Sequence, residues 1–289
     1  MRAAVTARTT GASGRLRMYR WAWIAAAAGC FALLTVGCAH RAPVGQPTAD
    51  AKPGDCHRIP TPEAMVTASD NSPTVPCTAV HNVETYLTFT YHGRYAKRTS
   101  RPLPEQLDGD IGQDCVNYDA IRNYLGAGSH DEQWGVSAWH KYPSPSEWAH
   151  GVRLIRCDLV PDSGLSGPRI TQSLRNILQR KDSARFRLCY RANKPVTCDK
   201  PHDTEALAGS PTLAAGQFPD RATLERVAAQ ACTTPIHDYI AGSLPADFVV
   251  KPTLPTADMW THGDRHVDCG FGPAQTGRLV TGTMRGGLS

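Results

Sequence analysis

The sequence predicts an α+β protein built from two tandem, disulfide-stapled repeats, each with a small antiparallel sheet and one main helix. Three observations lead to this fold class. A pattern of cysteine, histidine and glutamate occurs twice in the same order, eight cysteines follow the N-terminal segment, and strand-like stretches stand beside stretches with helical spacing. The 289 residues, 41% hydrophobic and 20% charged, are enough for two such units.

The duplication is visible in two pairs of segments. "VPCTAVHNVE" (75–84) and "VTCDKPHDTE" (196–205) share Val, Cys, His and Glu at the same offsets. "PSPSEWAHGVRLIRC" (143–157) and "PTADMWTHGDRHVDC" (255–269) share Pro, Trp, His, Gly, Arg and Cys without a gap. We therefore expect a first repeat over 53–162 and a second over 185–289, joined by a linker over 163–184 that can hold a short helix.

Strands are expected where residues alternate. The segment 83–91 predicts a strand with odd-numbered residues on one face and even-numbered residues on the other. The segment "VRLIRCDLV" (152–160) predicts a later strand, which follows a turn that contains Trp148. Each repeat then has two early strands, one long helix and a later strand pair.

Helical spacing places the third cysteine of each repeat in the core. In the second repeat the apolar residues of 222–232 recur at helical intervals, and Asp220 can cap the helix N-terminus. In the first repeat Leu107, Ile111, Cys115 and Tyr118 are expected on one face of a single long helix, which Gly126 can end.

The duplication also restricts the disulfide pairing, because it divides the cysteines into two sets of four. Cys189 and Cys198 flank a segment with turn-forming Asn-Lys-Pro and are expected to pair across a hairpin. The full prediction pairs Cys56 with Cys77, Cys115 with Cys157, Cys189 with Cys198, and Cys232 with Cys269.

The N-terminal segment predicts export. An arginine-bearing start and an apolar run over 21–37 have the layout of a signal peptide over 1–37. "TVGC" resembles a bacterial lipobox, which predicts a lipid anchor on Cys38, a flexible tether over 38–52 and a location on the extracytoplasmic face of the membrane. The alternative is an uncleaved anchor helix, since 17 apolar residues approach the length that spans a bilayer.

The charge balance argues against nucleic-acid binding. Five arginines lie in the first 37 residues, and removing them from the 31 basic residues leaves 26 against 26 acidic ones. Proteins that bind phosphate backbones carry a strong positive balance. No nucleic-acid partner is therefore expected.

The histidines, glutamates and arginines of the repeated motifs are the candidate binding residues: His81, Glu84, His150, Arg153, His202, Glu205, His262 and Arg265. We interpret them mainly as structural, with each early histidine holding the turn after its cysteine and each glutamate pairing with Arg153 or Arg265. The alternative is a metal site or an envelope hydrolase that uses the same residues. No cofactor, metal or catalytic residue is assigned, and a non-enzymatic protein is favoured.

The tryptophans fall into two groups. Trp148 and Trp260 occupy matching positions, and we expect both in the core beside a disulfide. Trp134 and Trp139 have no counterpart in the second repeat, so we expect them at a surface particular to the first.

The repeated order "GDCH", "VPCTAVHNVE", Cys, Trp, Cys resembles the septum-formation family of actinobacterial exported and membrane-anchored proteins. Val80 stands where the family has Pro, and Thr197 stands in the second copy where the first has Pro76. The resemblance implies an envelope protein associated with cell division and brings no catalytic residues with it. We expect a binding or scaffold module for a cell-envelope protein or cell-wall component, with a groove between the repeats as its ligand site.

Overall fold

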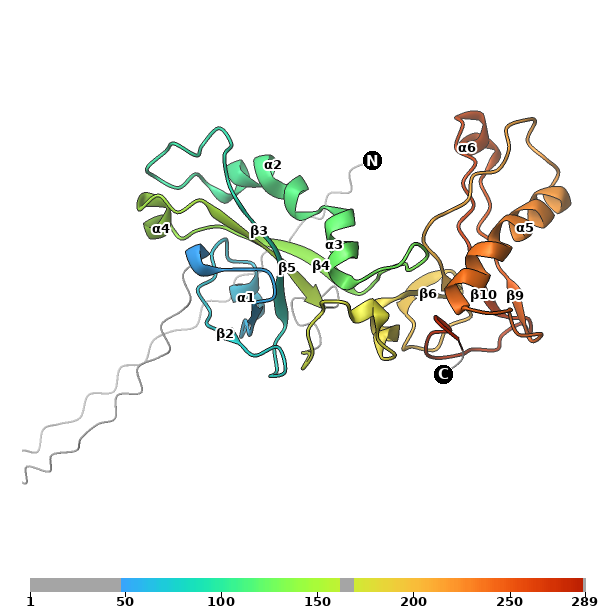
Figure 1. The fold of residues 1–289 in the computed structure, drawn as a ribbon. Coiled ribbons are helices and arrows are strands. Elements are labelled where there is room, and N and C mark those ends of the chain that lie inside the picture. The colour runs from blue at the N-terminus through green and yellow to red at the C-terminus, as the bar shows by residue number, and fades with distance from the viewer. Residues whose placement is uncertain (1–47, 162–168, 288–289) are drawn as a thin grey trace, which may run out of the picture. The chain divides into compact units, whose positions relative to one another are not determined.

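The computed structural model describes residues 48–161 and 169–287 (Figure 1). The predicted signal peptide, Cys38 and the tether up to residue 47 lie outside the described residues. Among the residues described, no helix has both the length and the apolar character needed to cross a membrane.

The first repeat is built on a five-stranded antiparallel sheet with the order β2-β1-β3-β5-β4. The strands are β1 (Cys56–His57), β2 (Thr74–Val75), β3 (Val83–Thr90), β4 (Val136–Lys141) and β5 (Leu154–Pro161). The helices are α1 (Pro62–Met65), α2 (Pro104–Cys115), α3 (Tyr118–Leu125) and α4 (Pro145–Ala149), with short 3-10 turns at Thr48–Asp50, Ile177–Gln179 and Ser183–Phe186.

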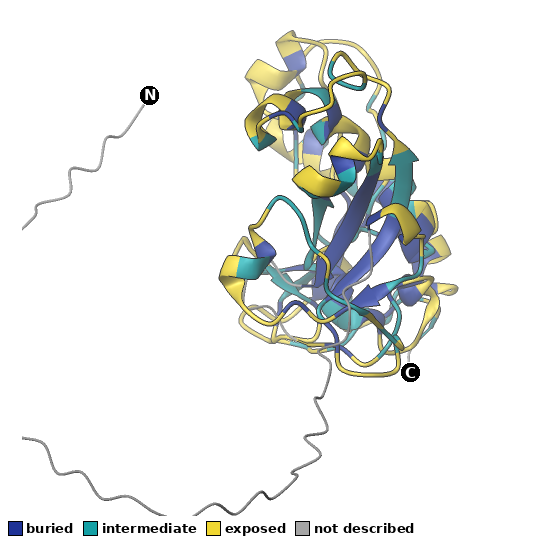
Figure 2. Cartoon of the chain, turned by 90° about the vertical axis from the view of Figure 1, so that its left-hand side faces the viewer, coloured by how far each residue is buried: buried dark blue, intermediate teal, exposed yellow. Residues whose placement is uncertain are grey.

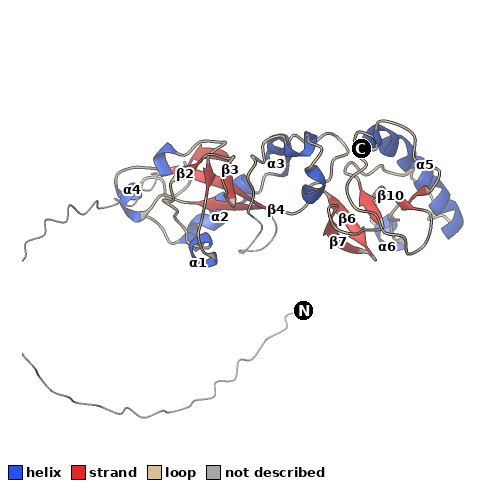
Figure 3. Ribbon diagram, turned by 90° about the horizontal axis from the view of Figure 1, so that it is seen from below, coloured by secondary structure: helices blue, strands red, loops and turns tan. Residues whose placement is uncertain are grey.

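The second repeat has the same architecture, with the strand order β7-β6-β8-β10-β9. Figure 3 labels three of these strands, β6, β7 and β10, together with the helices α5 and α6. Its strands are β6 (Leu188–Arg191), β7 (Lys194–Thr197), β8 (Thr204–Ala206), β9 (Phe248–Val250) and β10 (Gly270–Pro273), and its helices are α5 (Arg221–Ile240) and α6 (Ala257–Thr261). Each second-repeat strand occupies the place of its first-repeat counterpart. The α+β class and the two small antiparallel sheets are therefore confirmed.

All four predicted disulfides are formed: Cys56–Cys77, Cys115–Cys157, Cys189–Cys198 and Cys232–Cys269. The hairpin of the third disulfide turns at Ala192 and Asn193, both with positive φ, as a two-residue hairpin loop requires. Within the core clusters of their repeats, the second disulfide ties α2 to β5, and the fourth ties α5 to Cys269, which directly precedes β10.

The alternation predicted for 83–91 is wrong beyond Thr85. A register shift between Thr85 and Leu87 forms a β-bulge that leaves Tyr86 as the extra residue. Leu87 pairs with Cys157 on the helix-covered face, where an uninterrupted strand would have placed it on the opposite face. A bulge moves every residue after it to the face opposite the one that simple alternation predicts, and the sequence pattern alone does not reveal it.

The single long helix predicted for the first repeat is two helices. The helix α2 ends at Cys115, and α3 begins after Asn117, whose side chain accepts a hydrogen bond from the Ala120 amide at 3.0 Å. The break resets the helical phase, so Tyr118 is exposed instead of sharing the buried face of α2. In the second repeat Asp220 caps the N-terminus of α5, as the sequence predicts.

The stretch predicted as a linker contributes to the core of the first repeat. Ile170, Leu174, Ile177 and Leu178 are at most 2% exposed and pack with Trp148 and the residues of the first sheet. Two 3-10 turns stand where a short helix was considered. Figure 2 shows the central strands of the first sheet in dark blue, buried by these segments and the helices.

Residues 130–134 of the first repeat form β-bridges with residues that flank β6 and β8 of the second. Asp131 forms a β-bridge with Leu207, and Gln133 forms one with Arg187. The buried carboxylate of Asp131 lies 2.5 Å from the Arg187 guanidinium and 3.1 Å from that of Arg285. A segment of one repeat is thus part of the other repeat's fold.

Candidate functional site

The glutamate of the first repeated motif lies in the core. Glu84 is fully buried in β3, and its carboxylate accepts hydrogen bonds from the Tyr124 hydroxyl at 2.5 Å, the Ser173 hydroxyl at 2.6 Å and the Leu174 amide at 2.6 Å. Burial, followed by the charge of Glu84, raises the pKa of Tyr124, so its hydroxyl stays protonated and donates. The carboxylate therefore anchors α3 and the segment that follows β5.

The second repeat reproduces this arrangement. Glu205 in β8 accepts a hydrogen bond from the Tyr239 hydroxyl of α5 at 2.6 Å, another from the Thr283 hydroxyl, and a third from the Met284 amide at 3.0 Å. Burial, followed by the charge of Glu205, raises the pKa of Tyr239 well above its ordinary value. We call Glu84 and Glu205, each with its three donors, the glutamate clamps.

The clamp partners reveal a further stretch of the duplication that sequence reasoning missed. "ITQSLR" (170–175) and "VTGTMR" (280–285) supply the hydroxyl and amide donors at the same offsets from the start of each segment. The two segments share hydroxyl residues at their second and fourth positions and an arginine at the sixth, and this similarity could have revealed the match. It was overlooked because no cysteine marks either segment.

The early histidines support the clamps through their backbones and rings. His81 exchanges two backbone hydrogen bonds with Ile170, and His202 does so with Val280, each at 2.9 Å. Each ring places Nδ1 2.8 Å from a carbonyl two residues earlier, of Ala79 or of Lys200. Since a carbonyl can only accept, Nδ1 is the protonated nitrogen in both rings. The histidines thus hold the turn after the cysteine, as the structural interpretation expects.

His81 and Glu84 approach each other more closely than a strand would allow, because His81 lies before β3 begins. Its Nε2 is 4.0 Å from the Glu84 carboxylate, which is too long for a hydrogen bond, and among the described residues this buried nitrogen has no hydrogen-bond partner. The two side chains are therefore close in space without a direct hydrogen bond between them.

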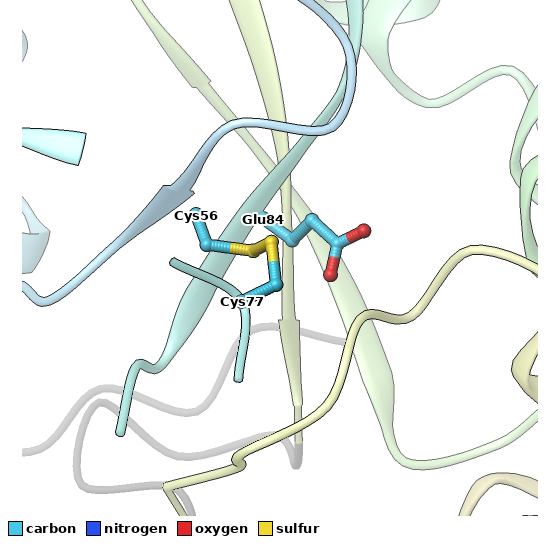
Figure 4. Close-up of side chains that lie close together, drawn as sticks. All are labelled: Cys56, Cys77 and Glu84. Carbon is cyan, nitrogen blue, oxygen red and sulfur yellow. A yellow bond between two sulfur atoms is a disulfide. The ribbon is translucent and has the colours of Figure 1, made fainter. Parts of the chain in front are cut away.

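The structure brings Cys56, Cys77 and Glu84 together, with their possible ligand atoms within 4.8 Å of one another (Figure 4). The two sulfurs form a disulfide, so neither is a thiolate that could bind zinc. The Glu84 carboxylate in turn already accepts three hydrogen bonds. This grouping does not support the metal alternative.

The later motif residues do not join this cluster. His150 and His262 follow the short helices α4 and α6 as their C-terminal caps, and both residues are exposed. Each ring donates through Nδ1 to a carbonyl four residues earlier, at 2.7 Å to Ser146 and at 2.8 Å to Asp258. The expectation that the glutamates pair with Arg153 or Arg265 is wrong. The clamps are made by hydroxyl and amide donors instead.

The two arginines fasten surface loops. Arg153 donates to the Ala96 and Trp148 carbonyls at 2.7 Å and stacks on the Trp148 ring, 4.0 Å from its centroid. Arg265 donates to the Leu213 carbonyl at 3.2 Å. The Trp148 and Trp260 rings are buried and donate to the carbonyls of these loops, so the core interpretation of both tryptophans agrees with the structure.

The remaining tryptophans have different surroundings. Trp134 is 42% exposed, and its amide donates to the Phe186 carbonyl in the segment that pairs with the second repeat. Trp139 is half-buried in β4 and packs against a small cluster that contains Met65 and Val160. Of the two, only Trp134 presents a largely open ring.

In the second repeat the glutamate clamp lies beside a cavity. A cavity of about 400 Å³ is lined by His202, Glu205, Phe248, Phe271 and Met284, together with the ion-paired Arg278 and Asp247. His202 and Glu205 are nevertheless at most 3% exposed, and the Glu205 carboxylate is occupied by its donors. The cavity could accept an apolar group but offers no free carboxylate for acid-base chemistry.

Comparisons with known proteins support the resemblance drawn from the repeated motifs. A family model described as septum formation matches residues 53–269, and a second match to it covers residues 207–286. The first match spans well over half of the chain and includes most of both repeats. Searches among curated proteins and among solved structures found no match.

Proposed function

The chain belongs to the septum formation family, and on this premise we propose that it is an exported, lipid-anchored binding protein of the dividing cell envelope. Family membership gives it a role related to septum formation. The proposal adds that it acts without catalysis, at the extracytoplasmic face of the membrane, on a cell-envelope protein or a cell-wall component.

Export is supported by the cysteine chemistry. Four disulfides staple the two repeats, and structural disulfides form and persist in oxidising compartments outside the cytoplasm. The arginine-bearing start, the apolar run and the lipobox-like "TVGC" provide the address, with Cys38 as the site of lipid attachment.

The observation that carries the non-catalytic proposal is the use of the glutamate clamps. The glutamate of the repeated motif, Glu84 in the first repeat and Glu205 in the second, is buried and accepts three hydrogen bonds from its own chain. A general base or metal ligand needs a free lone pair that faces its substrate or ion. These carboxylates close the fold, which leaves the surfaces between and around the repeats for binding.

Localisation in dividing cells tests the proposal. The full chain carries a C-terminal fluorescent protein that matures outside the cytoplasm, and a Cys38→Ala variant serves as the matched control for the lipid anchor. We expect the unaltered chain in the membrane fraction, labelled by a clickable palmitate analogue and concentrated at septa. The variant should lose the label. Uniform distribution together with normal septa after depletion would refute the proposal.

A metal measurement distinguishes the enzymatic alternative. The purified full chain, with His81→Ala and His202→Ala variants, is analysed for bound zinc, manganese and iron. We expect less than about 0.1 metal per chain, because the nearest sulfurs are bridged. One equivalent of metal that both variants lose would show that the motif histidines serve chemistry instead of architecture.

A further inference from the structure

The two repeats differ in what covers one face of the sheet. We call this the insert face. In the first sheet it carries His57, Lys141 and Arg156, and the segment 58–74 lies across it. Ile59 and Met65 of that segment pack with sheet residues, and all three polar side chains are at most 2% exposed.

Polar contacts join the segment to the first insert face. Lys141 Nζ donates to the Thr67 carbonyl at 2.7 Å, and Arg156 pairs with Asp70 at 2.5 Å. The ring nitrogen Nδ1 of His57 lies 3.2 Å from the Ser72 carbonyl. The first insert face therefore binds a polypeptide of its own chain through backbone carbonyls and one charged side chain.

The second repeat lacks this segment. The Cys189–Cys198 disulfide spans 9 residues where Cys56–Cys77 spans 21, so the second hairpin is shorter by 12. Ala206 and Gly270 form a cross-strand pair at the register that Thr85 and Asp158 occupy in the first sheet. Smaller side chains and a shorter hairpin leave the face open, with a cavity of about 790 Å³.

The charge at the centre of the open face is reversed. Asp268 directly precedes Cys269, just as Arg156 precedes Cys157. Asp268 is exposed and, like Glu132 from the crossing segment 130–134, lines the cavity. The Asp268 carboxylate accepts a hydrogen bond from the Ser210 hydroxyl at 2.7 Å, and the Glu132 carboxylate accepts one from the Tyr118 hydroxyl at 3.2 Å. In the described part of the chain neither carboxylate forms an ion pair.

Charge complementarity with the first repeat identifies the missing occupant. There Arg156 of the sheet pairs with Asp158 of the same sheet at 2.9 Å, and the covering segment supplies a second carboxylate, that of Asp70, at 2.5 Å. In the second sheet three acidic residues, Glu132, Asp203 and Asp268, line the cavity with one basic residue, Lys251, and the Asp203 carboxylate accepts a hydrogen bond from the Ala192 amide at 2.7 Å. The covering segment must then bring the positive charge.

We propose that the insert face of the second sheet binds a polypeptide segment of a partner protein, whose lysine or arginine side chain pairs with Asp268 and Glu132. The proposal rests on the proposed function, because it names the chemistry of the partner that the binding module takes. Lys251 also lines the cavity, and its Nζ donates to the Asp203 carbonyl of its own chain at 2.9 Å.

A fixed-position peptide library tests the proposal. The full chain, purified in detergent with its disulfides intact, is incubated with biotinylated heptapeptides whose central residue is Arg, Lys, Gln or Glu and whose other positions are mixed. The variants are an Asp268→Asn/Glu132→Gln double substitution and Asp258→Asn as a matched control. The Asp258 side chain is 87% exposed on α6 and does not line the cavity.

The unaltered chain should bind the Arg and Lys pools at least about fivefold more strongly than the Glu pool. The double substitution should abolish that preference, and the control should keep it. Equal binding of all pools, no binding above background, or a preference that survives the double substitution would overturn the proposal. Binding to purified cell-wall glycan without a preference among the peptides would do so too. Septal localisation would survive each of these results, so they leave the proposed function standing.

Discussion

Replacing Glu84 by Ala removes the acceptor of one whole glutamate clamp. The Tyr124 hydroxyl and the Leu174 amide are buried, and both would lose their hydrogen-bond partner. A buried donor without a partner costs about 1–3 kcal/mol, so two of them are expected to lower the free energy of unfolding by about 4 kcal/mol. This is a large part of the roughly 5–15 kcal/mol that holds a typical domain folded.

Chemical unfolding of the full chain measures this change, with circular dichroism as the signal. The control is Glu225→Ala, because Glu225 is exposed and pairs only with Arg221 one helical turn away. Its removal should change the free energy of unfolding by about 0.5 kcal/mol or less. Glu205→Ala should repeat the effect of Glu84→Ala in the second repeat.

Hydrogen exchange separates the clamp from a general loss of stability. The Leu174 amide donates to Glu84 alone, so its protection should fall in Glu84→Ala by more than that of amides in α2. A loss of stability below about 1 kcal/mol, or unchanged exchange at Leu174, would refute the idea that the carboxylate closes the repeat.

Three further predictions follow from the same structure. Burial alone would raise the pKa of Asp131, but the Arg187 guanidinium and the Gly128 amide hold it below its ordinary value. The stability that this carboxylate contributes is therefore present above about pH 4 and is lost as the pH falls through the lowered pKa. When the free energy of unfolding is measured between pH 2 and 6, it should fall less steeply towards acid pH in Asp131→Asn than in the unaltered chain. Serine replacement of the Cys115–Cys157 pair should lower the free energy of unfolding by about 4 kcal/mol, and serine replacement of the Cys189–Cys198 pair should lower it by about 2.5 kcal/mol, because the first disulfide closes the longer loop. A larger loss for the Cys189–Cys198 pair in denaturant titrations would contradict the loop-entropy reasoning. Gly126→Ala should lower the thermal midpoint by several degrees, because φ is +72° and the added Cβ would lie 2.8 Å from Asn176 Cα, whereas Gly109→Ala, which meets no atom within 4 Å, should leave the midpoint unchanged or raise it.

Much of the fold could be predicted because the positions of the cysteines mark the two repeats and limit how they can pair. The duplication reduced the pairing to a few choices, and turn chemistry between Cys189 and Cys198 selected one of them. The capping residue Asp220 and the terminating Gly126 were equally readable, since each satisfies a local backbone requirement. For these residues local rules sufficed, because each acts on its near neighbours in the chain.

The failures are of two kinds: interactions between distant segments, and local shifts in a side-chain pattern. Glu84 was assigned an arginine partner because a carboxylate and a guanidinium are the commonest match, yet its donors come from residues 40 to 90 positions away. The bulge at Tyr86 and the helix break after Cys115 shift a side-chain pattern by a residue or two, which periodicity arguments do not detect. The charged insert face was missed because its meaning appears only when both sheets are compared.

The crossing of residues 130–134 into the second sheet has a consequence for how the molecule evolved and how it can be divided. A chain cut between the repeats would leave the second half without the strand partner of Leu207 and the first half with Asp131 unpaired. The two repeats thus share contacts that a cut would remove from both, and we expect neither half to keep its present structure alone. Two such halves expressed together would be expected to reassociate, whereas each alone should aggregate.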